Sequence, residues 1–293
     1  MFAKKIQYLA EIALLKAMLA FCRVLGLDRS SALGGWLGRN LGPKLGITRR
    51  ARGNIRRAMP ELSTEEVERI VIGMWDNLGR TAFEYAHLDK FSQPEERSRI
   101  EVVGVEALLA YAATGKGGIL ISGHFANWEL MPLAMRLEGL DGGGVYRAAN
   151  NPYVNDWMVT MRRELIVPEQ IAKGPKGARL LIQAIRDKRF VAMLIDQRLT
   201  EGIEAKLFGL PAMTTPTPAV LALRYKAALV PASIVRTKGA HFRVTVHEPV
   251  AIDDNAEPTG EILRVTQLLN DFLEARIREH PEGWFWLHNR WKD

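Results

Sequence analysis

From about residue 100 onward, short apolar runs alternate with stretches whose apolar residues recur at helical spacing. Such an alternation is typical of α/β folds, in which helices cover a central sheet. Residues 229–247 have the pattern of a hairpin around "TKGA", so we expect a mixed sheet flanked by helices. The predicted strands are 117–122, 143–147, 190–196, 229–236 and 241–247, and the predicted helices are 127–138, 152–165, 176–187, 216–227 and 258–279.

Residues 1–100 carry helical patterns throughout. In 60–88, Ser63 is a predicted N-cap and Glu66 completes a capping box. The Gly-rich segment 34–42 is expected to interrupt the helices. We therefore expect an N-terminal helix over 1–25, a helical region over 26–100, and an α/β core over 101–293 that forms one compact unit with 26–100.

Positive charge is concentrated near the N-terminus. Residues 1–60 contain twelve Lys or Arg against two acidic residues, a net charge of +10, so the other 233 of the 293 residues carry −3 of the total +7. This asymmetry indicates an anionic partner, such as lipid headgroups, an acidic protein or nucleic acid, unless it is simply a solvated face. The single cysteine, Cys22, excludes an intramolecular disulfide and a cysteine metal cluster, and it favours a reducing compartment.

The apolar segment 6–22, "IQYLAEIALLKAMLAFC", favours lipid headgroups among these possible partners. As a helix it is about 25 Å long, the lower limit for crossing a bilayer, and Glu11 and Lys16 make a full crossing expensive. No small-residue cleavage site follows it. We expect this helix to lie in a membrane interface or to act as a weak anchor, and the alternative is a helix packed on the protein's own core.

Polar residues follow three of the predicted strands. His124 comes after 117–122, Arg147 ends 143–147, Asp196 ends 190–196 and Gln197 follows it. Asn151 precedes a Pro and is a predicted helix cap. Because ligands of open α/β sheets bind at the carboxyl ends of the strands, these side chains define a candidate pocket.

His124 and Glu129 are spaced for general base chemistry. His124 lies in a strand-to-helix turn, where the positive helix end favours the uncharged imidazole that a base requires. Glu129 is placed to hydrogen-bond a ring nitrogen and to stabilise the imidazolium. From spacing alone, a structural histidine is the alternative. The chain has no H-E-x-x-H or G-x-S-x-G motif and no recognition motif for nucleic acid, so we expect no metal, no cofactor and no nucleic acid.

The segment "GHFANWEL" is similar to the H-x4-E motif of the late acyltransferases of lipid A biosynthesis in Gram-negative bacteria. Further blocks resemble this family in its order: "NIRRAMPELSTEEVERIVIGMWDNLGRTAFEY", "VYRAANNPYVND", "LIDQRLTEGIEAKLFGLPAMT", "LVPASIVR" and "PEGWFWLHNRWKD". Glycerophospholipid acyltransferases, which share a related fold, carry H-x4-D and a Pro-Glu-Gly-Thr-Arg block. The residue here is Glu129, and "PEG" at 281–283 continues into Trp284, which favours the lipid A branch.

The resemblance implies an inner-membrane enzyme, at the cytoplasmic face, that moves an acyl chain from acyl carrier protein to a hydroxyl of a phosphorylated lipid A precursor. His124 matches the general base and Glu129 its partner carboxylate. The candidate substrate-binding residues are Arg147, Asn151, Arg162, Arg163, Asp196 and Gln197. The alternatives are an acyltransferase for a lysophospholipid or an aminolipid, and a lipid-binding protein without catalytic activity.

Overall fold

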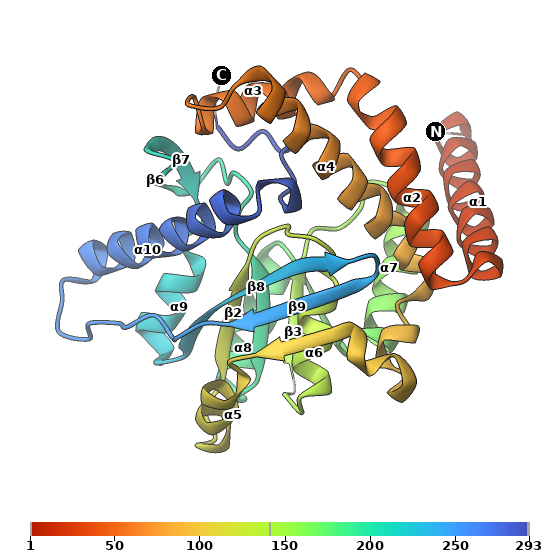
Figure 1. Cartoon of the computed structure of the whole chain (residues 1–293). Helices are drawn as coiled ribbons and strands as arrows, with labels where there is room; N and C mark the ends of the chain where they lie inside the picture. The colour runs from red at the N-terminus through yellow and green to blue at the C-terminus, as the bar shows by residue number, and fades with distance from the viewer. Residues whose placement is uncertain (1, 141, 292–293) are drawn as a thin grey trace.

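The computed structural model describes residues 2–140 and 142–291. The first residue of the expected N-terminal helix (1–25) and the last two residues of the expected α/β core (101–293) therefore lie outside the described residues, as does position 141. The centre of the structure is a seven-stranded sheet in the order β1-β9-β8-β2-β5-β3-β4 (Figure 1). Strands β8, β2, β5, β3 and β4 run parallel to one another. Strand β9 pairs antiparallel with β8, and the edge strand β1 pairs parallel with β9. The mixed sheet and the hairpin are confirmed. The strands are β1 (Ile100–Val103), β2 (Gly118–Ser122), β3 (Gly142–Tyr146), β4 (Glu169–Ala172), β5 (Phe190–Leu194), β6 (Ile203–Leu207), β7 (Leu210–Thr214), β8 (Ala228–Lys238) and β9 (His241–Val246).

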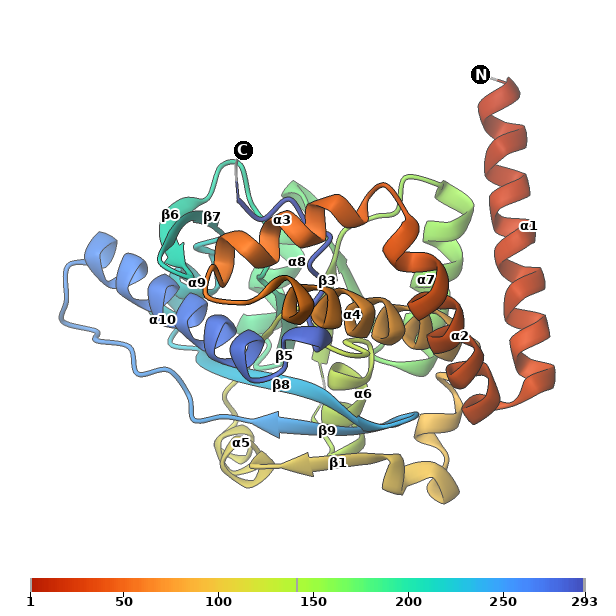
Figure 2. The ribbon, with the colours of Figure 1, turned by 45° about the horizontal axis from the view of Figure 1, so that its top comes forward.

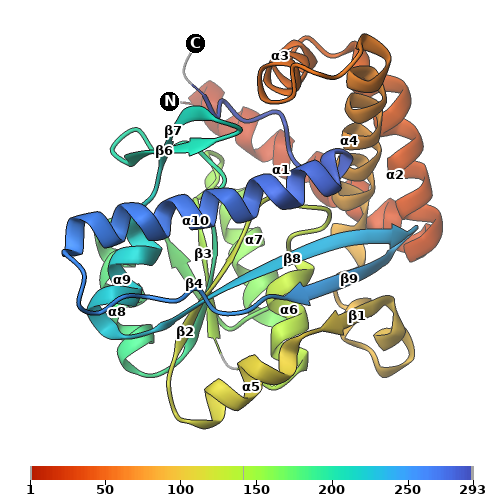
Figure 3. The same cartoon turned by 60° about the vertical axis from the view of Figure 1, so that its left-hand side comes forward.

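Helices cover both faces of this sheet. Because crossovers between parallel strands are right-handed, α6 and α7 cover one face, whereas α8 and α9 cover the other. Helix α10 packs beside α9 and runs along the sheet, as Figure 3 shows. The core helices are α5 (Val105–Ala113), α6 (Leu130–Leu137), α7 (Pro152–Leu165), α8 (Pro175–Arg186), α9 (Thr217–Tyr225) and α10 (Pro258–Glu279). The central strands β8, β2 and β5 are mostly apolar and buried, as in β2, where all five residues are buried.

The N-terminal region is helical, as predicted. It consists of α1 (Phe2–Leu25), α2 (Leu27–Leu41), α3 (Thr48–Ala58) and α4 (Thr64–Glu84), followed by 3₁₀ turns up to residue 99. The capping box of α4 is present, since the Ser63 hydroxyl accepts from the Glu66 amide and the Glu66 carboxylate accepts from the Ser63 amide.

The expectation of a break at 34–42 is wrong for most of this segment, because α2 continues through residue 41. The glycines allow α2 to approach α4 closely. A Cβ at Gly34 would collide with the Gly79 carbonyl, and one at Gly38 would collide with the Trp75 carbonyl. Gly here permits backbone contact between two helices rather than a turn.

Helix α1 stands at the edge of the molecule, and its first turns extend beyond the neighbouring helices (Figure 2). One side, with Leu19 and the fully buried Cys22, packs on Ala86. The other side exposes large apolar residues: Ile6, Leu9, Leu14, Phe21 and Val24. Among the helices of the described residues, none combines the length and the apolar character that crossing a bilayer requires.

The C-terminal tail runs back to the loop that follows β2. Phe125 forms a β-bridge with Trp284, the Ala126 amide donates to the Gly283 carbonyl at 2.8 Å, and the Phe285 amide donates to the His124 carbonyl at 3.2 Å. Trp284, Trp286 and Trp291 in this tail are all buried. The tail therefore supports the loop that carries His124.

Candidate active site

A cavity of about 320 Å³ lies at the carboxyl ends of β2, β3 and β5. This position agrees with the general rule for open α/β sheets. One part of its wall is apolar and is formed mainly by Trp128, Met131, Pro132, Val145, Met158, Ile166, Val167, Ala192 and Leu194. The polar part is formed by Tyr85, His124, Glu129, Arg147, Arg162, Lys173 and Gln197.

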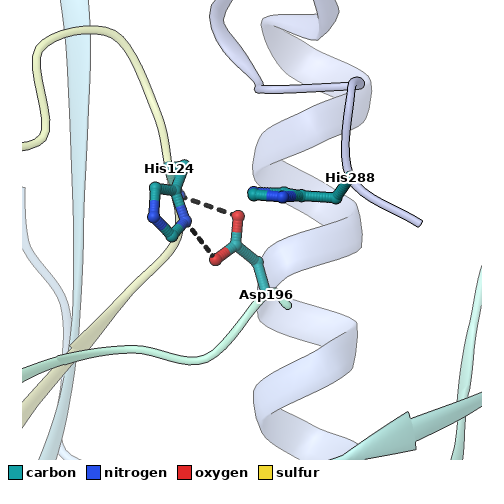
Figure 4. Close-up of side chains that lie close together, drawn as sticks. All are labelled: His124, Asp196 and His288. Carbon is teal, nitrogen blue, oxygen red and sulfur yellow. Dashed lines mark hydrogen bonds and ion pairs between the residues drawn. The ribbon is translucent and has the colours of Figure 1, made fainter. Parts of the chain in front are cut away.

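His124 is held by Asp196, which follows β5. The His124 Nδ1 atom lies 2.7 Å from Asp196 Oδ1, and the His124 backbone amide donates to Asp196 Oδ2 at 2.8 Å (Figure 4). A carboxylate can only accept hydrogen bonds, so Nδ1 carries the proton and Nε2 of the neutral ring keeps an unprotonated lone pair that faces the cavity side of the ring. This tautomer is the one that a histidine base needs.

Asp196 is fully buried and is charged because of its partners. Burial alone would raise the pKa of Asp196, but electrostatic attraction to the His124 ring and hydrogen bonds from its ring and backbone N–H groups lower this pKa below its ordinary range. The Trp284 indole also donates to Asp196 Oδ2 at 2.8 Å. Three N–H groups thus fix the carboxylate, and the carboxylate fixes the imidazole.

Glu129 lies elsewhere in the site than the sequence-based hypothesis placed it. Its carboxylate accepts from the Tyr85 hydroxyl at 2.6 Å and from Arg162, whose Nε is 2.9 Å from Oε2 and whose Nη2 bonds Oε1. The hydrogen bond expected between Glu129 and the His124 ring is therefore made by Asp196 instead. The reason is that the buried Glu129 carboxylate requires a charged partner, which Arg162 on α7 supplies.

Charge and burial also shift the pKa values of Arg162 and Tyr85, the two partners of Glu129. Burial alone would lower the pKa of Arg162, but the charge of Glu129 outweighs this effect and raises it. Burial, together with the Glu129 charge, raises the pKa of Tyr85 well above its ordinary value. Tyr85 is therefore a neutral donor beside a buried ion pair at the cavity wall.

The other predicted residues divide into two groups. Arg147 and Gln197 line the cavity. Asn151 caps α7 by accepting from the Tyr153 amide, and its own amide donates to the Tyr8 carbonyl and to Glu11, so its hydrogen bonds tie α1 to α7. Arg163 is exposed on α7, outside the cavity wall.

Besides Tyr85 and Trp284, described above, the structure adds Lys173 and His288, which sequence reasoning also missed. Lys173 lines the cavity, and burial lowers its pKa. His288, in the C-terminal tail, packs its ring 4.9 Å from that of His124. The tail block "PEGWFWLHNRWKD" contains His288, but this residue follows no predicted strand, so chain order alone does not bring it to the site.

The ligand atoms of His124, Asp196 and His288 lie within 4.8 Å of one another, a spacing that a metal ion can bridge. In this arrangement, however, both Asp196 oxygens already accept N–H bonds, and one of these comes from the His124 nitrogen that faces it. The donor set therefore fits a hydrogen-bonded pair better than a metal centre. That no metal takes part stays a prediction, which dialysis against a chelator followed by an activity assay tests.

A neutral histidine that a carboxylate holds at the wall of a partly apolar cavity is an arrangement able to accept a proton from a bound molecule. The chain belongs to the bacterial lipid A biosynthesis acyltransferase family, whose sequence profile it matches over residues 1–293. This membership confirms the resemblance seen in the sequence and defines the protein as an acyltransferase.

The chain is similar to characterised proteins at low identity. It is 25% identical over 245 residues to a lipid A biosynthesis lauroyltransferase of Escherichia coli, covering 82% of this chain and 77% of that protein. It is 20% identical over 241 residues to a lipid A biosynthesis acyltransferase of Haemophilus influenzae, covering 81% and 73%. It is 26% identical over 193 residues to a phosphatidylinositol mannoside acyltransferase of Mycobacterium tuberculosis, covering 64% and 58%. The family thus supports acyl transfer to lipid A or to a related glycolipid.

Proposed function

We propose that this protein transfers a fatty acyl chain from the thioester of acyl carrier protein to a hydroxyl of a phosphorylated lipid A precursor, with His124 as general base. The observation that carries the proposal is the His124–Asp196 pair at the cavity wall. Its geometry leaves His124 Nε2 as the proton acceptor.

The reaction follows from this geometry. The acceptor hydroxyl gives its proton to His124 Nε2 as its oxygen attacks the thioester carbonyl carbon. The tetrahedral intermediate then breaks its C–S bond, and the leaving thiolate takes the proton back from the imidazolium. Asp196 stabilises the imidazolium between these two steps, as the carboxylate of a catalytic triad does. No acyl-enzyme is formed, and Cys22 is buried in α1, away from the cavity.

Glu129 acts in this proposal through Arg162. Two Arg162 nitrogens bond its carboxylate, which holds the guanidinium against the cavity. Arg147 and Lys173 add two further cations to the cavity wall. These three cations suit the phosphates of the acceptor, since arginine binds phosphate in a bidentate manner.

The membrane surface is the proposed location, at the cytoplasmic face of the inner membrane. The exposed apolar side of α1 provides the contact, and Lys4, Lys5 and Lys16 complement anionic headgroups. Sedimentation with phosphatidylglycerol vesicles tests this location: the Leu14→Ser variant is expected to weaken binding, whereas Leu180→Ser, at an exposed position on α8, is expected to leave it unchanged.

A transfer assay with the purified full-length chain tests the function. Donors are acyl carrier protein thioesters of several chain lengths, with coenzyme A thioesters for comparison. Acceptors are a phosphorylated lipid A precursor and a lysophospholipid. We expect transfer from the carrier thioester to the lipid A precursor. Transfer to the lysophospholipid alone contradicts the proposed acceptor, and equal use of coenzyme A thioesters contradicts the proposed donor.

A second acceptor class is favoured by the similarity to the phosphatidylinositol mannoside acyltransferase. A mannosylated phosphatidylinositol also offers sugar hydroxyls next to a phosphate, so the same His124 base and the same cations suit it. Including this lipid in the assay distinguishes the two glycolipids, since the preferred acceptor gives the higher kcat/KM.

A further inference from the structure

We infer that Gln197 donates the hydrogen bond that stabilises the oxyanion of the thioester during transfer, and that His288 holds the Gln197 amide in the orientation this requires. The inference rests on the proposed acyl transfer and adds two residues to it. Its starting point is one nitrogen atom: Gln197 Nε2 lies 3.4 Å from His124 Nε2 and 3.3 Å from His288 Nε2.

The chemistry of the amide fixes the direction of both contacts. An amide nitrogen has two N–H donors and no lone pair to offer, so both ring nitrogens must accept. Burial lowers the pKa of His288 to about 4, although the charge of Asp196 opposes this, so His288 remains an uncharged acceptor at neutral pH. Because His288 accepts one N–H, the nitrogen end of the amide, rather than its oxygen, faces His124.

His288 is itself well anchored. The Asn54 amide on α3 donates to its backbone carbonyl at 2.7 Å. Its ring packs edge-on against Phe285, with centroids 4.6 Å apart. The His288 ring also lies beside that of His124 (Figure 4). The tail thus places a fixed acceptor, His288 Nε2, on the side of the Gln197 amide away from His124. An amide that only filled space would not need this acceptor.

The second N–H becomes available when substrate binds. In the structure it points to the His124 lone pair that the acceptor hydroxyl needs. When the hydroxyl takes that lone pair, this N–H is displaced while the other stays on His288. The attacked carbonyl carbon is one bond from the hydroxyl oxygen, so its oxygen develops negative charge within reach of the displaced N–H. As the C–O bond forms, the carbonyl π electrons move to this oxygen, and they return when the C–S bond breaks.

Steady-state kinetics test the inference. Gln197→Ala and the nearly isosteric Gln197→Glu both remove the donor, and each is expected to lower kcat about 100-fold to 1,000-fold. KM for both substrates is expected to stay within about threefold, because the lost interaction is made only in the transition state. His288→Phe keeps an aromatic ring but removes the acceptor, and a misplaced donor is expected to lower kcat about 10-fold to 100-fold. His288→Gln, which retains an acceptor oxygen, is expected to recover part of this loss.

Matched controls separate these effects from damage to the fold. Gln183→Ala changes an exposed glutamine on α8, and His247→Phe changes a half-buried histidine that packs on Phe272. Both are expected to leave kcat unchanged. Thermal unfolding checks each variant, and Gln197→Glu replaces Gln197→Ala if the latter does not fold.

The outcomes distinguish this inference from the proposed function. If wild type transfers acyl chains, His124→Ala does not, and both Gln197 variants keep kcat within about threefold of wild type, the inference fails while the function stands. A rise in KM without a fall in kcat also overturns it, since Gln197 would then bind substrate only. If His124→Ala retains activity, the proposed function fails and the inference fails with it.

Discussion

Asp196 and His124, which lie 72 residues apart in the chain, are joined by two hydrogen bonds, one to the ring and one to the backbone amide of the histidine. The side chain and the loop that carries it are therefore oriented by the same carboxylate. An amide in place of this carboxylate would lose the charge that stabilises the imidazolium and would allow the wrong tautomer.

Asp196→Asn is accordingly expected to lower kcat on the order of a thousandfold or more. The transfer assay measures this loss, and Asp156→Asn, at an exposed position on α7, serves as the control. A loss of less than about tenfold would show that Asp196 is not the partner of the base.

Glu129→Gln is expected to destabilise the protein, because it leaves the mostly buried Arg162 guanidinium without its counter-charge. Breaking a buried ion pair in this way costs about 3 kcal/mol of unfolding free energy. Urea unfolding measures the effect, with the exposed Glu164→Gln on α7 as control. If Glu129→Gln leaves stability unchanged and abolishes activity, Glu129 acts on the reaction directly and not through Arg162.

Gly38→Ala is expected to cost about 2 kcal/mol or more, because its Cβ would collide with the Trp75 carbonyl and push α2 from α4. A Cβ added at Gly53, in α3, would meet no atom within 4 Å apart from the neighbouring backbone of its own helix. Gly53→Ala is therefore expected to stabilise the protein by up to about 1 kcal/mol. Equal effects of the two substitutions in urea unfolding would refute the close approach of the helices.

Stability is expected to fall as the pH is lowered from about 6.5 to about 4. In this range the unfolded chain binds a proton at His288, whose pKa in the folded protein is about 4, so the unfolded state binds more protons and stability rises with pH. Burial also lowers the pKa of His87 and His247, which add to the slope. In His288→Phe, urea unfolding at several pH values is expected to show a smaller loss, by about 2 kcal/mol. An unchanged slope would contradict the neutral, buried state of His288.

Much of the fold could be predicted from periodicity. Strands β2, β5 and β8 are apolar runs, β9 alternates apolar and polar residues, and β3 is a short apolar run after glycines; all five lie at their predicted positions within a few residues. Strand β4 was missed because Glu169 and Gln170 interrupt its apolar pattern at the sheet edge. The helix over the Gly-rich segment was missed because its stability comes from contact with α4, which a local pattern does not contain.

The site could be predicted only in outline. Chain order placed His124, Arg147 and Asp196 at one edge of the sheet, where they are found. The partners of each side chain depended on packing between distant segments. Glu129 is near His124 in sequence, yet its carboxylate bonds Arg162. Asp196 contacts His124 because β5 lies beside β2 in the sheet, and His288 contacts it because the C-terminal tail packs on the loop after β2.

The rate of acyl transfer by His124→Ala tests the central claim most directly. With acyl carrier protein thioester and lipid A precursor as substrates, this variant is expected to be slower than wild type by at least about a thousandfold, because general base catalysis is lost. His241→Ala, an exposed histidine on β9, is expected to match wild type. Transfer by folded His124→Ala at a rate near that of wild type would contradict the account.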